Sequence, residues 1–208
     1  MKRIIPFVLL LLTLNACKKD DPVPADNGTS SADVPTYFPL AIGNYWVYNF
    51  QSYDPDGVPF GTTSVDSLQV VGDSLINDEL YYQLETSKPV ERTLFLREDN
   101  GYVVSAFGSI MTTPGPDSEV YNAHYNVISD DTMHFYFDQF PRTDLITTNF
   151  GNEECLAQES VHEMFPNFGG AVIIDTTYYA SFGPVERSYS FAAGTTMKGV
   201  LTSYHLEE

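Results

Sequence analysis

The stretch that decides the fold class of this chain is residues 44–51, which read NYWVYNFQ. Trp46, Tyr48 and Phe50 stand at every second position, so a β-strand formed here would carry one wholly aromatic face. The strand is expected to end at residues 54–57, DPDG, where proline presets one backbone angle and glycine accepts another. The pattern therefore predicts a half-buried strand followed by a tight turn.

Working outward from this strand, we find the same kind of short run ten more times, with turn residues between the runs. The runs cover residues 62–71, 79–85, 92–97, 101–107, 120–128, 133–140, 154–159, 172–180, 185–191 and 197–206, and residues 112–118 form a Pro/Gly loop. Asn100-Gly101 joins two of them and is the strongest short hairpin signal. We predict an all-β fold, an antiparallel meander of about ten or eleven strands curled into a barrel or half-barrel. At most one or two short helices are expected, with residues 160–165 as the candidate.

The first residues have the three parts of an export signal: basic Lys2 and Arg3, an apolar core, and small or polar residues at the cut. The apolar core is too short to span a bilayer as a mature anchor. It ends at Leu14-Asn15-Ala16-Cys17, which resembles the lipobox of bacterial lipoproteins. This resemblance implies a signal peptide over residues 1–16, cleavage between Ala16 and Cys17, and lipid attachment at Cys17. An ordinary signal peptide with an incidental cysteine is the alternative.

Residues 17–36 are expected to form the lipidated cysteine and a flexible tether, because Pro, Asp, Ser and Thr in this stretch cannot bury a core. Residues 37–208 have the length of a single β domain. The run Lys18-Lys19-Asp20-Asp21 resembles export tags of surface lipoproteins in Bacteroidota-type bacteria; a solvated linker start is the other interpretation. The expected location is the outer membrane at the cell surface, with its periplasm-facing leaflet as the alternative.

Charge and cysteine content narrow the expected partners and cofactors. The formal net charge is −18 at pH 7, and loss of Lys2 and Arg3 with the signal would make it −20. Such a charge disfavours nucleic acid as a partner. If Cys17 carries lipid, Cys155 is the remaining cysteine, which excludes an intramolecular disulfide and a thiolate metal cluster. Cys155 is expected to be a small buried apolar residue, and no cofactor is predicted.

Three segments resemble one known family. Residues 38–48, FPLAIGNYWVY, resemble the opening Phe-Pro-Leu-x-x-Gly-Asn-x-Trp-x-Tyr of a set of uncharacterised lipoproteins of Bacteroidota-type bacteria. Residues 76–82, INDELYY, resemble its Ile-Asn-Gly-x-x-Tyr-Tyr hairpin, with Asp78 where Gly is usual. Residues 182–187, FGPVER, followed by LTSY at 201–204, resemble its closing hairpin, with Pro184 as a departure. The resemblance implies a β-rich lipoprotein domain and no established activity.

The sequence contains the short motifs of GDSL esterases, since residues 72–75 read GDSL and residues 131–134, DTMH, match their Asp-x-x-His. A nucleophilic serine needs a histidine base and a carboxylate that orients it. In GDSL esterases, however, the serine follows the first strand of an α/β domain, whereas Ser74 is expected in a turn between two short strands of an all-β chain. We therefore predict no catalytic residue here, Asp131 and His134 included.

Metal sites are not predicted either. The histidines His124, His134, His162 and His205 are scattered, although His162-Glu163 and nearby Glu159 could meet on a helical turn. Hard oxygen ligands for calcium occur at Asp54 with Asp56 and at Asp130 with Asp131, but no loop has EF-hand spacing. Acidic turns of this kind are mostly solvated.

Aromatic residues are numerous for one small domain: Tyr45, Trp46, Tyr48, Tyr81, Tyr82, Tyr102, Tyr121, Tyr125, Tyr136, Tyr178, Tyr179 and Tyr189. Adjacent pairs such as Tyr81-Tyr82 must place one ring on each face of a sheet. Exposed rings on a concave sheet suit the binding of lipid, glycan or peptide. The predicted function is a membrane-anchored, non-catalytic module that binds such a ligand or an envelope protein. A cell-surface hydrolase acting on esters or glycans, and a purely structural or assembly component, are the alternatives.

Overall fold

The computed structural model describes residues 36–87, 92–129, 132–166, 172–191 and 194–207. These residues form twelve β-strands and no helix, so no helix in this part of the chain is long and apolar enough to span a membrane. The strands are β1 (Tyr45–Tyr53), β2 (Pro59–Ile76), β3 (Glu79–Thr86), β4 (Thr93–Asp99), β5 (Tyr102–Ser105), β6 (Ile110–Thr112), β7 (Asp117–Ser129), β8 (Thr132–Thr148), β9 (Gly151–Pro166), β10 (Val172–Ala180), β11 (Gly183–Ser190) and β12 (Thr196–His205). The all-β prediction is confirmed.

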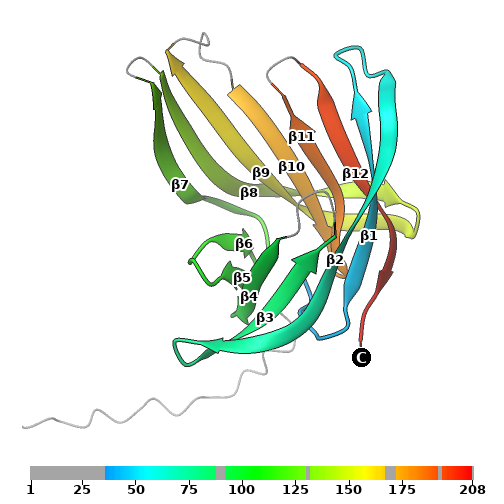
Figure 1. The fold of residues 1–208 in the computed structure, drawn as a ribbon, viewed down its shortest axis with the longest axis vertical. Helices are drawn as coiled ribbons and strands as arrows, with labels where there is room; N and C mark the ends of the chain where they lie inside the picture. The colour runs from blue at the N-terminus through cyan, green and yellow to red at the C-terminus, as the bar shows by residue number, and fades with distance from the viewer. Residues whose placement is uncertain (1–35, 88–91, 130–131, 167–171, 192–193, 208) are drawn as a thin grey trace, which may run out of the picture. The chain divides into compact units, whose positions relative to one another are not determined.

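One antiparallel sheet contains all twelve strands, in the order β6-β5-β4-β3-β2-β1-β12-β11-β10-β9-β8-β7 (Figure 1). Consecutive strands pair with each other throughout, except β6 and β7, which form the two edges. The ends of the meander meet in the middle of the sheet, where Tyr45 of β1 lies opposite His205 of β12. The domain is therefore a nearly closed barrel with one seam, between β6 and β7, as the barrel or half-barrel prediction expected.

Two tight hairpins have the backbone conformation that their sequences require. Asn77 and Asp78, between β2 and β3, have φ of 52° and 66°, and Asn100 and Gly101, between β4 and β5, have φ of 53° and 84°. Positive φ at both central residues characterises the type I′ turn, whose twist matches that of the flanking strands. The Asn-Gly hairpin is thus confirmed. Asp78 adopts the same conformation without glycine, because Asn and Asp tolerate it better than other side chains.

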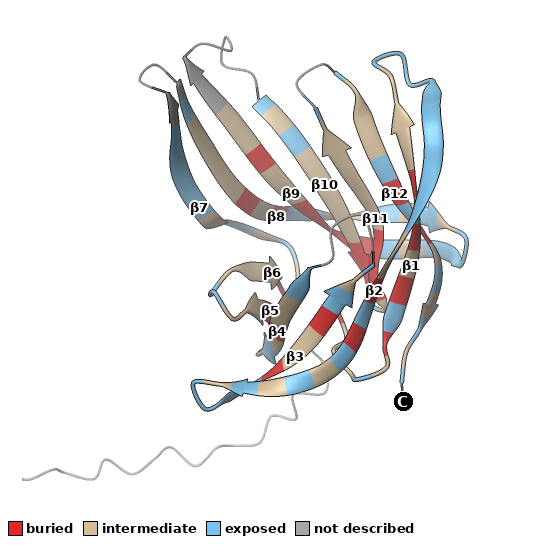
Figure 2. Cartoon of the chain, viewed as in Figure 1, coloured by how far each residue is buried: buried red, intermediate tan, exposed pale blue. Residues whose placement is uncertain are grey.

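The apolar core follows the aromatic face of β1. Trp46, Tyr48 and Phe50 are all buried, together with Leu84 and Leu96 of β3 and β4. The Trp46 indole N–H donates a hydrogen bond to the Phe182 carbonyl at 2.6 Å. In Figure 2 the buried residues gather toward the middle of the domain, whereas the upper parts of the strands are mostly intermediate or exposed.

Glycine makes this packing possible at Gly183. A Cβ added there would lie 2.3 Å from the Trp46 indole nitrogen, and Gly183 has φ +117°. A side chain at this position would meet both a steric clash and an unfavourable backbone conformation. The indole ring therefore rests directly on the backbone of β11, which agrees with the half-buried strand predicted for residues 44–51.

The structure corrects four local predictions. The helix expected at residues 160–165 is wrong, because these residues extend β9 and pair with both β8 and β10. Strand β6 was not predicted and raises the number of strands to twelve. Ser74 lies within β2 opposite Tyr81, not in a turn. Strands β2, β8 and β9 have 18, 17 and 16 residues, far longer than the runs expected from the sequence.

Cys155 is buried as predicted, and the adjacent tyrosines of each pair differ in burial, as expected for neighbours on opposite faces of a sheet. Cys155 is fully buried, and burial raises the pKa of its thiol to about 12. Of the adjacent tyrosines, Tyr81 and Tyr179 are buried, whereas Tyr82 and Tyr178 are partly buried and pack against the core cluster. Both faces of the sheet are thus covered at these positions.

Candidate functional site

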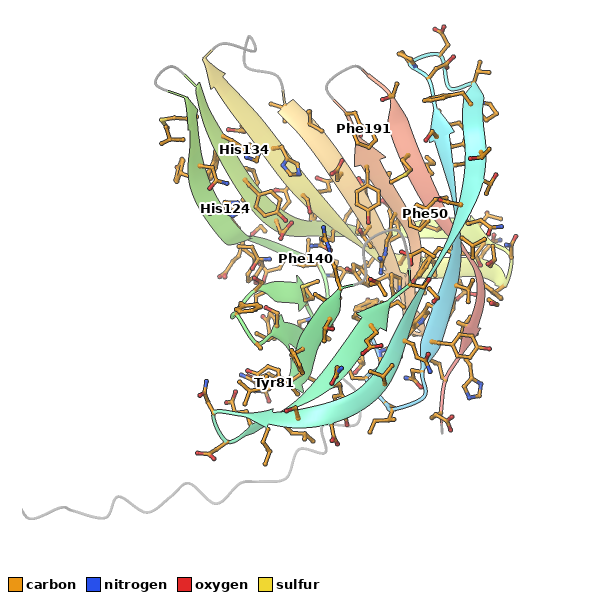
Figure 3. All side chains as sticks on the ribbon, in the orientation of Figure 1. Phe50, Tyr81, His124, His134, Phe140 and Phe191 are labelled. Carbon is orange, nitrogen blue, oxygen red and sulfur yellow. The ribbon has the colours of Figure 1, made fainter. Side chains whose placement is uncertain are left out.

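Polar side chains line the inner face of the sheet from β7 to β11. Strand alternation places Tyr136 and Asp138 of β8 on the same face as Ser160 and His162 of β9, since Asp138 lies opposite Ser160 and Tyr136 opposite His162. Figure 3 shows His124 and His134 on the β7–β8 side of the domain and Phe50 on the β1 side. We use the name inner-face cluster for Asn122, Tyr136, Asp138, Gln158, Ser160 and Tyr179.

Asp138 is the centre of the inner-face cluster and is only 3% exposed. Its carboxylate accepts hydrogen bonds from the Tyr136 hydroxyl at 2.7 Å, the Ser160 hydroxyl at 2.5 Å and the Asn122 side-chain amide at 2.7 Å. Burial is the main reason why the pKa of Tyr136 is raised, to about 12, so this hydroxyl stays a donor. Three neutral donors thus hold one buried carboxylate, which has further lone pairs for a fourth.

Asn122 also closes the seam of the barrel. Its side-chain oxygen accepts from the Ile110 backbone N–H at 2.8 Å, and its side-chain nitrogen donates to the Ile110 carbonyl at 2.7 Å. The side-chain amide thereby replaces the backbone pair that a β6–β7 ladder would supply. Asn122 can reach across because the register of β7 shifts between Tyr121 and His124, and its φ is +53°.

Beside the seam lies a hollow of about 700 Å³. Its lining includes Tyr136, Asp138 and Gln158, and the Gln158 side-chain oxygen accepts from the Tyr179 hydroxyl at 2.9 Å. A larger hollow, of about 840 Å³, lies over the other face of β2 and β3. It contains no aromatic ring and no residue of the inner-face cluster, so the hollow at the seam is the better candidate site.

Arg187 of β11 lies farther along the same face, opposite Gly199 of β12 and Thr177 of β10. Its guanidinium carbon is 4.8 Å from the centre of the Tyr48 ring, close enough for a cation–π contact. Burial lowers the pKa of Arg187, but Tyr48 and hydrogen-bonded Tyr189 oppose this and the pKa ends above its usual value. The side chain is therefore charged and keeps part of its surface open to solvent.

Among the described residues, no carboxylate lies within 4.0 Å of the Arg187 guanidinium. Arg97 and Arg142 have acidic partners: Arg97 contacts Glu79 and Asp99, and Arg142 contacts Asp144 and Glu159. Among the described residues Arg92 also has no acidic partner, but it is exposed, so water solvates its charge. A charge removed from water without a partner costs free energy, so such residues are conspicuous in a folded protein. Arg187 is the strongest candidate for a ligand-binding residue.

A histidine pair and a carboxylate extend the inner face toward the open end. His134 Nε2 lies 3.1 Å from His162 Nδ1, with parallel rings, and His162 Nε2 lies 3.7 Å from an Asp175 oxygen. Burial and the neighbouring His162 lower the pKa of His134. Burial raises the pKa of Asp175, against the effect of its hydrogen bond from the Ser190 N–H. Within the described ranges, no three His, Cys, Asp or Glu side chains are placed to hold a metal ion.

The residues of the esterase motif are not brought together as a catalytic set. Ser74 has no hydrogen bond to a histidine among the residues described, and His134 is bonded to His162. Asp131 lies outside the described residues. The same is true of Ala16, Cys17 and Asp130, so the lipid attachment and the second acidic turn stay predictions.

The other proposed ligands have structural explanations. Asp54 accepts from the backbone N–H groups of Asp56 and Val58, at 3.0 and 2.8 Å, which stabilises the turn. Glu159 and His162 were expected to meet on a helical turn. They lie on opposite faces of β9, because the chain is extended there.

The exposed aromatic rings are only partly where the binding hypothesis placed them. Phe107, which is 95% exposed, lines the hollow at the seam. Tyr125 is 67% exposed and stacks on Phe135, but strand alternation places this pair on the outer face, opposite to His124 and Tyr136. The rings of the inner face, such as Tyr136 and Tyr189, are half-buried. Polar groups and partly buried rings therefore characterise the strands of the inner face, and Phe107 adds one exposed ring at the hollow.

Sequence reasoning missed Asn122, Asp138, Gln158 and Arg187. A signal for Asp138 existed in HFYFDQF, residues 134–140, where His134, Tyr136 and Asp138 stand at every second position between phenylalanines. Aromatic residues on both faces concealed this alternation. Arg187 ends FGPVER, the segment that resembles the family's closing hairpin, but its lack of an acidic partner is a property of the folded chain that no sequence pattern reports.

Comparisons with known proteins add a similar fold at low sequence identity. The sequence matches no protein-family model and no curated protein. Two solved structures are similar, a candidate exported protein with a YmcC-like fold from Bacteroides fragilis and a candidate lipoprotein from Parabacteroides distasonis. They have TM-scores of 0.47 and 0.48 at 12% and 15% identity, and each comparison covers 83% of this chain and 100% of the other. The lipobox and the family motifs are not tested by these neighbours and stay predictions.

Proposed function

We propose that this protein is a lipid-anchored envelope protein whose β domain binds a polar ligand on its inner face without catalysing a reaction. The observation that carries the proposal is Arg187, a charged side chain deep in the domain that has a tyrosine ring and a tyrosine hydroxyl as neighbours in place of a carboxylate. An unpaired charge of this kind is characteristic of binding sites, where function outweighs the stability lost.

The inner-face cluster supports binding in preference to catalysis. Ser160 donates its hydroxyl hydrogen to Asp138, and no described serine is hydrogen-bonded to a histidine that could act as its base. The groups of the cluster are instead fixed by one another, as in the contact between Tyr179 and Gln158. Fixed polar groups beside a hollow bind and orient a ligand at little entropic cost.

The anchor part of the proposal rests on the sequence alone. Cys17 at the end of the lipobox would carry the lipid, residues 18–36 would act as the tether, and the outer membrane, with the domain at the cell surface, is the proposed location. Mass spectrometry of the mature N-terminal peptide should find an acylated Cys17, and Cys17→Ala should release the protein from membranes. An unmodified N-terminus elsewhere would contradict the anchor. Protease treatment of whole cells tests the leaflet separately.

Ligand binding at the inner face can be tested by filling it. Thr177 lies opposite both Arg187 and Gln158, so Thr177→Trp would place a large ring between them. A panel of monosaccharides, amino acids and short-chain lipids, followed by ligand-observed NMR, should include compounds that bind the wild-type protein and not this variant. Ile174→Trp, at an exposed position on the outer face of the same strand, is the control and should bind as the wild type does. Equal binding to both variants would contradict the inner face as the site.

A further inference from the structure

We propose that Arg187 binds an oxyanion group, a carboxylate or a phosphate, of a small hydroxyl-bearing molecule that lies along the inner face. This inference rests on the proposed binding function and names the chemistry of its ligand. A guanidinium has five N–H donors, and Tyr189 supplies the one hydrogen-bond partner that Arg187 has among the described residues.

Within the part of the chain that the structure describes, Arg187 lacks an acidic partner although the chain has many acidic residues. The sequence has 28 acidic residues and 10 Lys and Arg residues, so carboxylates are plentiful. Arg97, Arg142 and Lys198 each contact at least one of them within 4.0 Å. These three lie nearer the surface, where an ion pair contributes little to stability. Arg187, the cation at which a partner would matter most, has none among the described residues.

The surroundings of Arg187 hold its guanidinium in place and leave donors free. The Tyr48 ring lies 4.8 Å from the guanidinium carbon, and the Tyr48 hydroxyl is itself fixed by donating to the Pro184 carbonyl at 2.9 Å. The Phe50 ring lies against Gly199, the residue opposite Arg187, and Arg187 itself keeps part of its surface open to solvent. A planar guanidinium held against a ring can still present two parallel N–H groups, the arrangement that carboxylate and phosphate match best.

The other end of the site is suited to hydroxyl groups. The Tyr179 side chain lies between the two ends, because Thr177, two residues before it on the same face of β10, is opposite both Arg187 and Gln158. The Tyr179 hydroxyl donates to Gln158, which lines the same hollow as Asp138. Asp138 can accept a further hydrogen bond and repels anions, so the hydroxyl end of a ligand belongs there and the anionic end at Arg187. The site is thus polarised along the inner face.

Three matched probes test this assignment: D-glucuronate, D-glucose 6-phosphate and neutral D-glucose, titrated at constant ionic strength. The full chain in a neutral polyoxyethylene detergent would be observed by NMR at the Arg187 Nε–H and at the inner-face tyrosines. At least one charged sugar should bind about ten-fold or more tightly than glucose, since a charge-assisted pair is worth that much. The two charged probes distinguish a carboxylate from a phosphate.

Arg187→Gln should abolish the preference for the charged sugar, leave glucose binding unchanged, and keep or raise the melting temperature, because it removes an unpaired charge from the interior. Arg142→Gln, which removes an arginine with two acidic partners, should keep the preference. If Arg187→Gln retains the preference or clearly lowers the melting temperature, Arg187 is structural and the inference is wrong. If glucose perturbs the inner face as strongly as the charged sugars do, the proposal that the inner face binds a ligand is supported and the proposal that Arg187 binds an oxyanion is contradicted. If no probe perturbs the inner face, both proposals fall.

Discussion

The two halves of this single sheet use aromatic residues in opposite ways. Around Trp46, rings and aliphatic side chains exclude solvent, and Leu84, Leu96 and Val103 complete a core that is fully buried. Around Arg187, rings of the same kind surround charged and hydroxyl groups that keep part of their surface open. The same backbone ladder supports both halves. The difference lies in which residues stand at the inward positions of each strand.

The region around Trp46 stabilises the fold, whereas the region around Arg187 has groups available to contact a ligand. A core residue is satisfied by its neighbours in the folded chain, as the Trp46 indole is by the Phe182 carbonyl. On the described part of the inner face, Arg187 is a charged group without an acidic partner in the folded chain. Substitutions should accordingly reduce stability sharply in the first region and weakly, or not at all, in the second.

Trp46→Ala should have the largest effect and defines the stable side of the comparison. It removes a fully buried ring that rests on Gly183, so the free energy of unfolding should fall by about 3–5 kcal/mol. Urea denaturation followed by circular dichroism measures this. Phe107→Ala is the control, because that ring is 95% exposed and its loss should change stability little. A Trp46→Ala protein as stable as the wild type would remove the distinction between the two halves.

Asn122→Ala should have an intermediate effect and sharpens the comparison at the boundary. It leaves the Ile110 N–H and carbonyl without their side-chain partner and takes a donor from Asp138. We expect a loss of about 1–3 kcal/mol and faster hydrogen exchange at Ile110. Asn126→Ala, at an exposed position of the same strand and face, serves as the control. Unchanged exchange at Ile110 would show that the seam does not depend on the amide of Asn122.

Asp175→Asn should have the smallest effect and the opposite sign. Burial raises the pKa of Asp175, so the folded protein holds this proton to a higher pH than the unfolded chain does. The stability gained from the protonated form is present at low pH and is lost as the pH rises through the raised pKa. At pH 7 the buried charge therefore costs free energy, and an amide should avoid that cost.

The gain for Asp175→Asn at pH 7 should be under about 1 kcal/mol and should shrink as the pH falls toward 4. Urea denaturation between pH 4 and 7.5 measures it, with Asp56→Asn in the exposed turn as the control. A loss of stability at pH 7 would mean that the contact of Asp175 with His162, at 3.7 Å, outweighs burial. Asp175 would then be stabilised by its neighbours in the folded chain, as the core residues are.

The sequence predicted the apolar half better than the polar half, for a physical reason. Alternation of Trp46, Tyr48 and Phe50 reports burial on one face directly, and the turn at Asn100-Gly101 specifies its own geometry. Both depend on residues close together in the chain. Strand β6 was missed because it has three residues and lies next to a Pro/Gly loop.

The candidate site could not be assembled in the same way, because its members come from different strands. Asp138 and Ser160 are 22 positions apart, and Asn122 joins them only through a register shift in β7. In residues 160–165, SVHEMF, both the odd and the even positions mix polar with apolar residues, so the sequence lacks the simple alternation of a half-buried strand. A short helix was predicted there for this reason. The register of β8 against β9, not any local pattern, creates the inner-face cluster.

The pairing of β1 with β12 has a consequence for how the domain folds. Tyr45 pairs with His205 and Tyr48 with Leu201, so the central ladder joins segments more than 150 residues apart. Closing so long a loop costs chain entropy before any contact repays it, and folds dominated by such contacts form in milliseconds to seconds. During synthesis β1 can pair with β2 early, but its other edge stays without a partner strand until β12 has left the ribosome. Chaperones or export factors that bind extended chains thus have the whole of translation in which to act.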